Sequence, residues 1–347
     1  MAREYVDDHR LFLYHGGSLV GDITDRVSGL TARDERNALS VELSFTVLKN
    51  RTDALAPDLK LAPGDKVRVI NHALEVFSGV IVTAGLDGSV TAYDQGWYLN
   101  KSQIIFQASG VAAEDAVARL CAKAGIPLGG CVSLPTRIQK IWTGSEPSAI
   151  LSEILEICAA ETGEEYVYRV ASGKLWVNRQ TREPVAAYHR PADNLSPFPI
   201  TWALGEVSGS DSMEELCNRF VLTESNGDEA KVIGTAENPD SIARYGLVQR
   251  VESLGGDENT AQARQRLKNL LAKNDRLTRT REVSQIWGCD EVRSGVVLSF
   301  GSDTYGLSGL YRVDAVTHSY GKPHLMSLTL SELDSPRAAG TGDVVNV

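Results

Sequence analysis

The chain has 347 residues, of which 42% are hydrophobic and 23% are charged, as in an ordinary water-soluble globular protein of about two to three domains. Its 45 acidic residues outnumber 35 Lys and Arg, and the resulting net charge of −10 argues against a protein that holds duplex DNA on a basic surface. No signal peptide, transit peptide or membrane-spanning apolar run is visible, so we expect a cytosolic protein.

The cysteines predict neither a zinc site nor a disulfide framework. They are odd in number, scattered, and contain no Cys-x-x-Cys pair: Cys121, Cys131, Cys158, Cys217 and Cys289. We expect buried free thiols.

The N-terminal region reads as a series of strands. A short strand, Arg10 to His15, is followed by a strand from Asp22 to Leu30. A charged turn from Arg33 to Asn37 leads into a cleanly alternating strand from Leu39 to Leu48. The prolines after Asp53 indicate a surface loop up to Leu61.

Leu61 to Leu99 predicts an antiparallel meander, because apolar and polar residues alternate along it and Asp87-Gly88 suits a tight hairpin turn. Gly295 to Leu333 has the same order of parts, so we interpret it as a second copy. Upstream of the second copy, Cys217 to Leu222 is the expected counterpart of the strand that precedes the first.

Between the two copies the period becomes helical. Ala113 to Ala124 predicts a short amphipathic helix that stops at Gly125. A second helix is expected to be capped by Ser145, to bury Ile150 to Cys158 on one side and to end at Gly163. A hairpin from Tyr166 to Asn178 completes a small α+β module.

The proline-rich stretch Pro184 to Pro199 predicts a linker. After it, Asn238 and Pro239 indicate the start of a short helix that Gly246 ends. A longer helix is expected from Asp257 to Asn274, with basic residues on a solvated or partner-facing side.

Motifs for catalysis are missing from the sequence. There is no phosphate loop, dinucleotide fingerprint, metalloprotease helix or nucleophile elbow. Glu164 and Glu165 are interpreted as solvated acids on a turn, and His318 and His324 as hydrogen-bonding groups at strand ends. The sequence therefore assigns no catalytic, cofactor-binding or metal-ligating residue and predicts no cofactor. A core-packing role is expected for all the tryptophans: Trp97, Trp142, Trp176, Trp202 and Trp287.

Three longer segments carry a family resemblance. These segments are AYDQGWYLNKS (92–102), ENPDSIARYGLVQ (237–249) and GLYRVDAVTHSYGKPHLMSLTL (309–330). They resemble segments at matching places in baseplate hub proteins of contractile phage tails, and the chain is similar to the PBSX-type tail hub family, which also occurs in phage-tail-like bacteriocins. The resemblance implies a structural, non-enzymatic homotrimer with two tube-like β-barrels per chain, joining the six-fold tail tube to the three-fold spike.

Pattern and resemblance together predict a mainly β fold with an α+β insert, in which two tail-tube-like β-barrels flank a small α+β module. The expected parts are a first barrel (1–101), the module (102–182), a linker (183–200), a second barrel (201–334) with the helix 257–274, and a C-terminal tail (335–347). We expect the chain to be assembled in the bacterial cytoplasm as a component of a virion or tail-like particle. Rival functions are a tail-associated cell-wall hydrolase and a carbohydrate-binding module.

The expected partners are two further copies of the chain, the tail tube protein, the spike protein and other baseplate proteins. Neither a membrane nor stable nucleic-acid binding is expected. The net charge suggests an acidic lumen that DNA could traverse without adhering, and the sequence leaves open whether the particle delivers DNA or only kills. The tail residues Val344, Val345 and Val347 are predicted to dock on another subunit or on the spike-side partner. The two barrels are predicted to superpose and to lie side by side at similar radius, so that three chains present six similar units.

Overall fold

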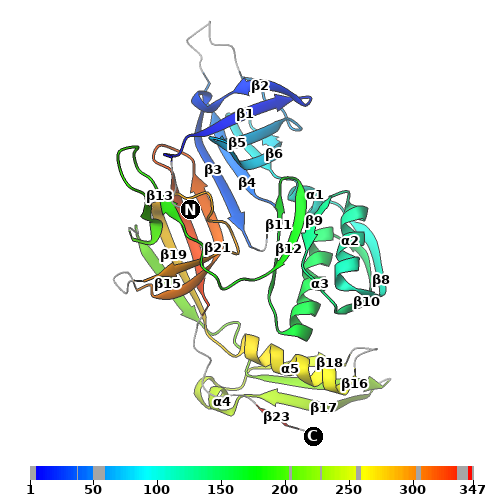
Figure 1. The fold of residues 1–347 in the computed structure, drawn as a ribbon. Coiled ribbons are helices and arrows are strands. Elements are labelled where there is room, and N and C mark those ends of the chain that lie inside the picture. Colours follow the sequence, from blue (N-terminus) through cyan, green and yellow to red (C-terminus); the bar gives the residue numbers. More distant parts are fainter. Residues whose placement is uncertain are drawn as a thin grey trace.

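The computed structural model describes residues 5–36, 38–49, 59–202, 205–226, 229–254, 259–301, 306–333 and 343–345. The fold is mainly β, as predicted, and its largest element is a 12-stranded sheet. Two smaller parts flank this sheet, a helix-containing module beside it and an α/β unit below it in the view of Figure 1. No helix of the described residues is long and apolar enough to cross a membrane.

The first part of the large sheet, which we call the N-terminal unit, comes from the first hundred residues. Its elements are β1 (His9–His15), β2 (Ser18–Asp22), η1 (Thr24–Arg26), β3 (Val27–Glu35), β4 (Glu42–Val47), β5 (Lys66–Asn71), β6 (Leu74–Ala84), β7 (Ser89–Tyr93) and α1 (Gly96–Leu99). Strands β5, β6 and β7 form the predicted antiparallel meander. Their inward residues, such as Val67, Val69 and Ile81, are almost fully buried because alternate residues of a strand share one face. The proposed loop 53–61 lies mostly outside the described residues.

The second part, the C-terminal unit, comes from residues after 200. Its strands are β15 (Val207–Ser212), β19 (Thr278–Trp287), β20 (Val297–Phe300), β21 (Gly309–Ser319) and β22 (Leu325–Glu332). Strands β20, β21 and β22 form the second meander. A separate core, which includes Val283, Val313 and Leu328, lies under them.

The two units follow the same strand path. The N-terminal unit runs β3-β4-β7-β6-β5, and the C-terminal unit runs β15-β19-β22-β21-β20, with antiparallel pairing throughout. Each long strand also carries a bulge at the matching place, between Ile81 and Thr83 in β6 and between Val313 and Ala315 in β21. This shared path supports an internal duplication. The counterpart of β4 is β19, however, and not the strand at Cys217 to Leu222 that the sequence pattern favoured.

The two units are joined edge to edge in one continuous sheet. Strand β21 of the C-terminal unit pairs antiparallel with β3 of the N-terminal unit, from Ala315 opposite Glu35 to Ser319 opposite Thr31. The units have separate cores but share their hydrogen-bonded sheet (Figure 1). The strand path of the described residues does not close on itself in either unit, so the two barrels stay a prediction.

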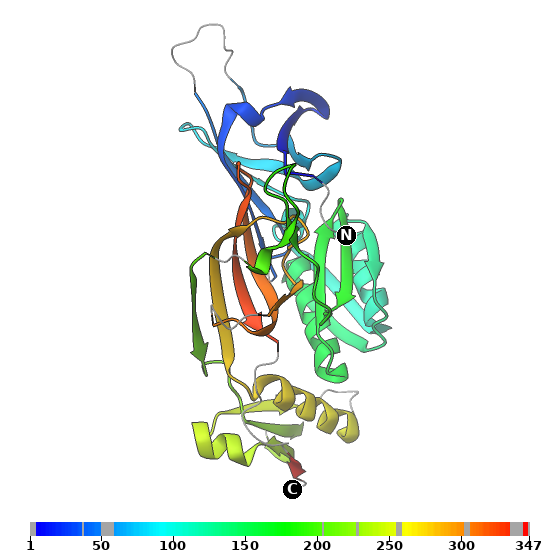
Figure 2. The same ribbon diagram turned by 60° about the vertical axis from the view of Figure 1, so that its left-hand side comes forward.

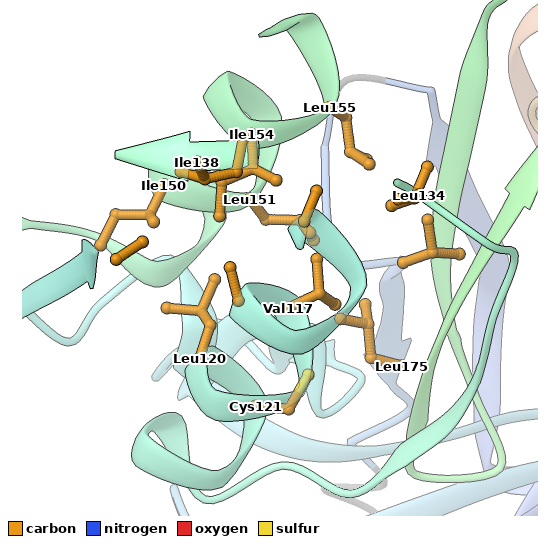
Figure 3. Packing of buried hydrophobic residues seen from close by; sticks show 14 of the residues in the cluster. Val117, Leu120, Cys121, Leu134, Ile138, Ile150, Leu151, Ile154, Leu155 and Leu175 are labelled. Atoms are coloured by element: carbon orange, nitrogen blue, oxygen red, sulfur yellow. The ribbon is translucent and has the colours of Figure 1, made fainter. Parts of the chain in front are cut away.

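The α+β module contains the two predicted helices and the predicted hairpin, together with three further strands. It contains β8 (Ile104–Ala112), α2 (Ala113–Ala124), β9 (Leu128–Cys131), β10 (Arg137–Ser145), α3 (Pro147–Thr162), β11 (Tyr166–Ala171) and β12 (Lys174–Arg179). The apolar stripes of α2 and α3 face each other across the core that Figure 3 shows, with Val117, Leu120, Ile150 and Ile154 nearly inaccessible to solvent. Ser145 is the last residue of β10 and does not cap α3, which has Glu146 at its N-cap position.

The part of the chain between β15 and β19 forms a fourth unit rather than a portion of a second barrel. Strands β16 (Arg219–Asn226), β17 (Glu229–Glu237), β18 (Gln249–Ser253) and β23 (Asp343–Val345) make a four-stranded sheet, with α4 (Pro239–Tyr245) and α5 (Thr260–Asn274). Asn238 caps α4 as predicted. The inward residues of α5, Ala263, Leu267 and Leu271, pack in a core of this unit's own. Figure 2 shows α5 lying along this sheet, near the end of α3.

The proline-rich segment is packed against the C-terminal unit. Its short strands β13 (Tyr188–His189) and β14 (Phe198–Pro199) pair with each other, and η2 (Ile200–Trp202) follows. Ala187 and Ile200 belong to the core of the C-terminal unit. The segment therefore connects the module to that unit while covering part of its core.

Candidate functional site: the joint between the two β units

The joint is made by a charged stretch that sequence reasoning assigned to a turn. Arg33, Asp34 and Glu35 continue strand β3 and pair with Thr317, Val316 and Ala315 of β21. Hydrophobic periodicity could not find this strand end, because its residues are charged and its partner lies far along the chain. The joint satisfies the backbone groups of what would otherwise be a free strand edge.

Side chains reinforce the pairing. The Asp34 carboxylate accepts hydrogen bonds from the backbone N–H and the hydroxyl of Ser294, at 3.1 and 2.6 Å. The backbone N–H of Arg36 donates to the Asp314 carbonyl at 2.8 Å. Tyr320, just after β21, lies in the core of the N-terminal unit, and its N–H donates to the Leu30 carbonyl at 2.9 Å. The C-terminal unit therefore contributes the Tyr320 side chain to the N-terminal core.

Glu165 connects the joint to the module and to the fourth unit. Its carboxylate lies 3.1 Å from Arg36, 3.0 Å from Arg312 and 3.8 Å from Arg276. These arginines come from the turn after β3, from β21 and from the segment after α5. Burial alone would raise the pKa of Glu165, but the neighbouring arginines hold it below its usual value. The expectation of a solvated turn residue is therefore wrong for Glu165, while Glu164 is exposed as predicted.

A buried cluster of histidines and acids lies beside the joint, which we call the seam cluster: Asp7, His9, Asn71, Asp290, His318 and His324. His318 is the penultimate residue of β21, His324 lies in the β21–β22 turn, and Asp290 lies in the loop between β19 and β20. Asp7, His9 and Asn71 come from the N-terminal unit.

Every described member of the cluster has hydrogen-bond partners. His9 Nε2 lies 2.9 Å from one Asp290 oxygen, and Asn71 Nδ2 donates to the other at 2.7 Å. Asn71 Nδ2 also donates to Asp7 at 2.8 Å, and His324 Nδ1 lies 2.8 Å from Asp7. The cluster thus links the two units through polar contacts that exclude water.

The electrostatics keep His318 and His324 neutral near neutral pH. Burial, with the positive charge of Arg293, lowers the pKa of His318 to about 3. Burial also lowers the pKa of His324, although Asp7 opposes this. Burial would raise the pKa of Asp290, but His9 holds it well below the usual range of a carboxyl group. Sequence reasoning identified His318 and His324 but missed His9 and Asp290, whose contact spans 281 positions.

The surroundings of Cys121 and Cys158 favour the unreactive thiol form. Five cysteines are free and four of them are buried, as predicted. Burial raises the pKa of Cys121 and of Cys158 to about 11, so both stay protonated thiols. Trp142 is buried, but Trp202 is 74% exposed, which corrects the expectation of core packing for every tryptophan.

The predicted partner-docking residues of the tail are only partly described. Val344 and Val345 belong to β23, which pairs antiparallel with β17 of their own chain, with Val345 opposite Thr235. Val347 lies outside the described residues. The tail strand thus has a pairing partner within its own chain, and docking on another subunit stays a prediction.

Comparison with known proteins places this fold among phage tail proteins. The chain is 24% identical over 284 residues to the phage-like element PBSX protein XkdQ of Bacillus subtilis, covering 78% of this chain and 82% of that protein. The tail protein from Neisseria meningitidis MC58 superposes with a TM-score of 0.63 at 14% identity, over 95% of this chain and 97% of that one. The 43 kDa tail protein of prophage MuSo2 from Shewanella oneidensis gives a TM-score of 0.59 at 14% identity, over 94% and 100%. These likenesses confirm the resemblance to PBSX-type tail proteins. The YqbQ-like family model matches residues 30–331, and the chain belongs to the YqbQ-like family.

Proposed function

We propose that this chain is the structural hub of a contractile tail or tail-like particle, a homotrimer that joins a six-fold tail tube to a three-fold spike. The observation that carries the proposal is the joint between β3 and β21. This joint connects two units that have the same strand path. The contact is head to tail, because β3 lies at one edge of the N-terminal unit whereas β21 lies near the opposite edge of the C-terminal unit. Contacts of this kind generate rings when the rotation closes.

The same joint can be repeated between chains. In the C-terminal unit, β21 uses its first half to pair with β20 and its second half to pair with β3. In the N-terminal unit, β5 pairs with β6 only as far as Val80, and among the described residues Thr83 and Ala84 pair only with β7. The outer edge of β15, the counterpart of β3, ends the strand path. Strand β15 of one chain therefore fits against the end of β6 in the next.

Three chains joined in this way would present six alternating β units to a six-fold tube. The module and the fourth unit occur once per chain, so they would keep three-fold symmetry on the spike side. The net charge of −10 suits a lumen that DNA traverses without stable binding. Strand β23 of one copy could pair with β17 of another copy in the same register as it pairs with β17 of its own chain. We propose that Val344, Val345 and Val347 dock on a neighbouring subunit in this way.

A disulfide across the proposed joint tests this arrangement. Superposing the two strand paths on their shared bulge puts Thr83 of β6 opposite Ser212 of the next chain's β15. We expect a chain carrying T83C and S212C to form covalent dimers and trimers on mild oxidation. A chain carrying T83C and K174C, which places the second thiol on the module, is the matched control and should stay monomeric on a denaturing gel. Equal cross-linking in the two chains, or none in either, would contradict the joint.

We further propose that the chain has no catalytic residue. The described residues bring no nucleophile, base and orienting group together at an accessible position. Incubation with purified peptidoglycan should release no soluble fragments. Turnover that a single Ser or acidic substitution abolishes would overturn this part of the proposal, and glycan retention on a column would favour a carbohydrate-binding module.

A further inference from the structure

The hydrogen bonds of His318 and His324 fix which ring nitrogens carry protons. His318 Nε2 lies 2.9 Å from the Val292 carbonyl, which can only accept, so this nitrogen carries the proton. His324 Nδ1 lies 2.8 Å from an Asp7 oxygen, and a carboxylate likewise accepts. In neutral rings the remaining nitrogens, His318 Nδ1 and His324 Nε2, are therefore both unprotonated.

These two unprotonated nitrogens face each other at 3.1 Å. Two lone pairs at this distance repel unless a positive species lies between them. With metal–nitrogen bonds of about 2.05 Å, nitrogens this far apart subtend about 100° at a shared ion, close to a tetrahedral angle.

A third ligand of suitable chemistry is in place. The Asp290 carboxylate offers an oxygen within 4.8 Å of a ring nitrogen of each histidine, and Asp290, His318 and His324 are all buried. Two imidazoles and a carboxylate form a donor set that suits zinc and neighbouring divalent transition metals.

The residues around Asp290, His318 and His324 hold these three side chains in place. Metal-bound histidines usually donate their second N–H to a carbonyl or a carboxylate, as Val292 and Asp7 allow here. The ligand carboxylate is held in turn by His9 and Asn71. At Gly288 an added Cβ would lie 2.2 Å from the His324 ring, so only glycine leaves room for this imidazole. The Tyr320 ring stacks on His318 with centroids 5.6 Å apart and helps to exclude water.

We propose that Asp290, His318 and His324 bind a divalent transition metal ion of the zinc class, with Asp7 and His9 as supporting residues. The ligands come from the C-terminal unit, and the supporting residues Asp7 and His9 come from the N-terminal unit. The ion therefore fastens the joint from inside and is captured as the chain folds, since binding free energy at a buried site contributes to folding.

Metal content of the full chain tests the proposal. Protein produced with added zinc and dialysed without chelator should retain an equimolar amount of zinc, measured by elemental mass spectrometry. H318Q should lose it. H189Q, which alters a buried histidine outside the cluster, should retain it. D7N should weaken the affinity about 10–100-fold, the usual effect of removing a supporting carboxylate.

A second measurement covers the case in which H318Q fails to fold. Wild-type protein refolded with Co²⁺ should show the intense visible absorption of a low-coordinate site, and guanidinium should release the ion in the same transition that unfolds the joint. Metal-free wild type whose thermal midpoint does not change on refolding with Zn²⁺, or an H318Q variant that retains stoichiometric zinc, would overturn the proposal. Failure of the metal site would leave the trimer proposal standing, because the Thr83–Ser212 cross-link tests that proposal separately.

Discussion

At the scale of single residues, Glu165 shows how one carboxylate can connect several parts of a chain. Its charge faces Arg36, Arg312 and Arg276, and its side chain is 28% exposed. Replacing one partner of such a group leaves the remaining charges poorly solvated, which costs more than the loss of an exposed ion pair.

We predict that E165Q lowers the free energy of unfolding by about 1–3 kcal/mol at neutral pH, the range between exposed and buried ion pairs. Because the folded pKa is depressed, this contribution is present above the ordinary carboxyl pKa of 4.5 and is lost as pH falls through the folded value. Chemical denaturation at several pH values measures it. E164Q, the exposed neighbour, should have no effect. An E165Q deficit that persists undiminished in acid would contradict the charge argument.

Asp94 should show the opposite pH dependence. Burial raises its pKa to about 7, although the backbone N–H of Gly96 donates to it at 2.9 Å. The stabilising effect of the protonated form is complete below pH 4 and is lost as pH rises through about 7, because ionisation then favours the unfolded chain.

We therefore predict that D94N is more stable than the wild type at pH 8 by as much as about 4 kcal/mol, from 1.36 kcal/mol per pKa unit, and nearly equal to it at pH 4. Asparagine keeps an oxygen for the Gly96 N–H. Thermal unfolding of both proteins across this pH range is the measurement. A stability difference that does not vary with pH would show that Asp94 is ionised in the folded state.

At the scale of elements, the sequence predicts the helices well because their boundaries are marked locally. Gly125 and Gly163 end α2 and α3, and Asn238 caps α4, as expected. The strands of the large sheet could not all be predicted in the same way. Strand β19 has the mixed polar sequence TRTREVSQIW, whereas the apolar strand β16 gave the stronger signal and proved to belong to another sheet. The seam cluster could not be predicted from the sequence either, because its members come together only when strands far apart in the chain pair.

The attachment of α5 to α3 gives a prediction at this scale. Asn269 Nδ2 donates to the carbonyls of Ala160 and Glu161 at the end of α3, at 3.1 and 2.9 Å. N269A should cost about 1 kcal/mol, the net contribution of such hydrogen bonds. Hydrogen exchange should become faster in β16, β17 and α5 while the large sheet is unchanged. K268A, on the exposed side of the same helix, is the control. Uniformly faster exchange throughout the chain would contradict a local attachment.

At the scale of the whole molecule, the chain carries two units of the same strand path in one continuous sheet. The proposed ring of three chains rests on the shared strand path, the matching bulges and the head-to-tail joint. A three-fold ring of this chain could then match a six-fold tube without a separate adapter protein, because duplication within the chain gives each of the three copies two β units.

Electron cryo-microscopy of the assembled particle tests this central claim most directly. The account predicts three copies of the chain, with six β units alternating around one axis at similar radius and β15 of each copy paired with the end of β6 in the next. A native hexamer of this chain, or two units per chain at clearly different radii, would contradict it.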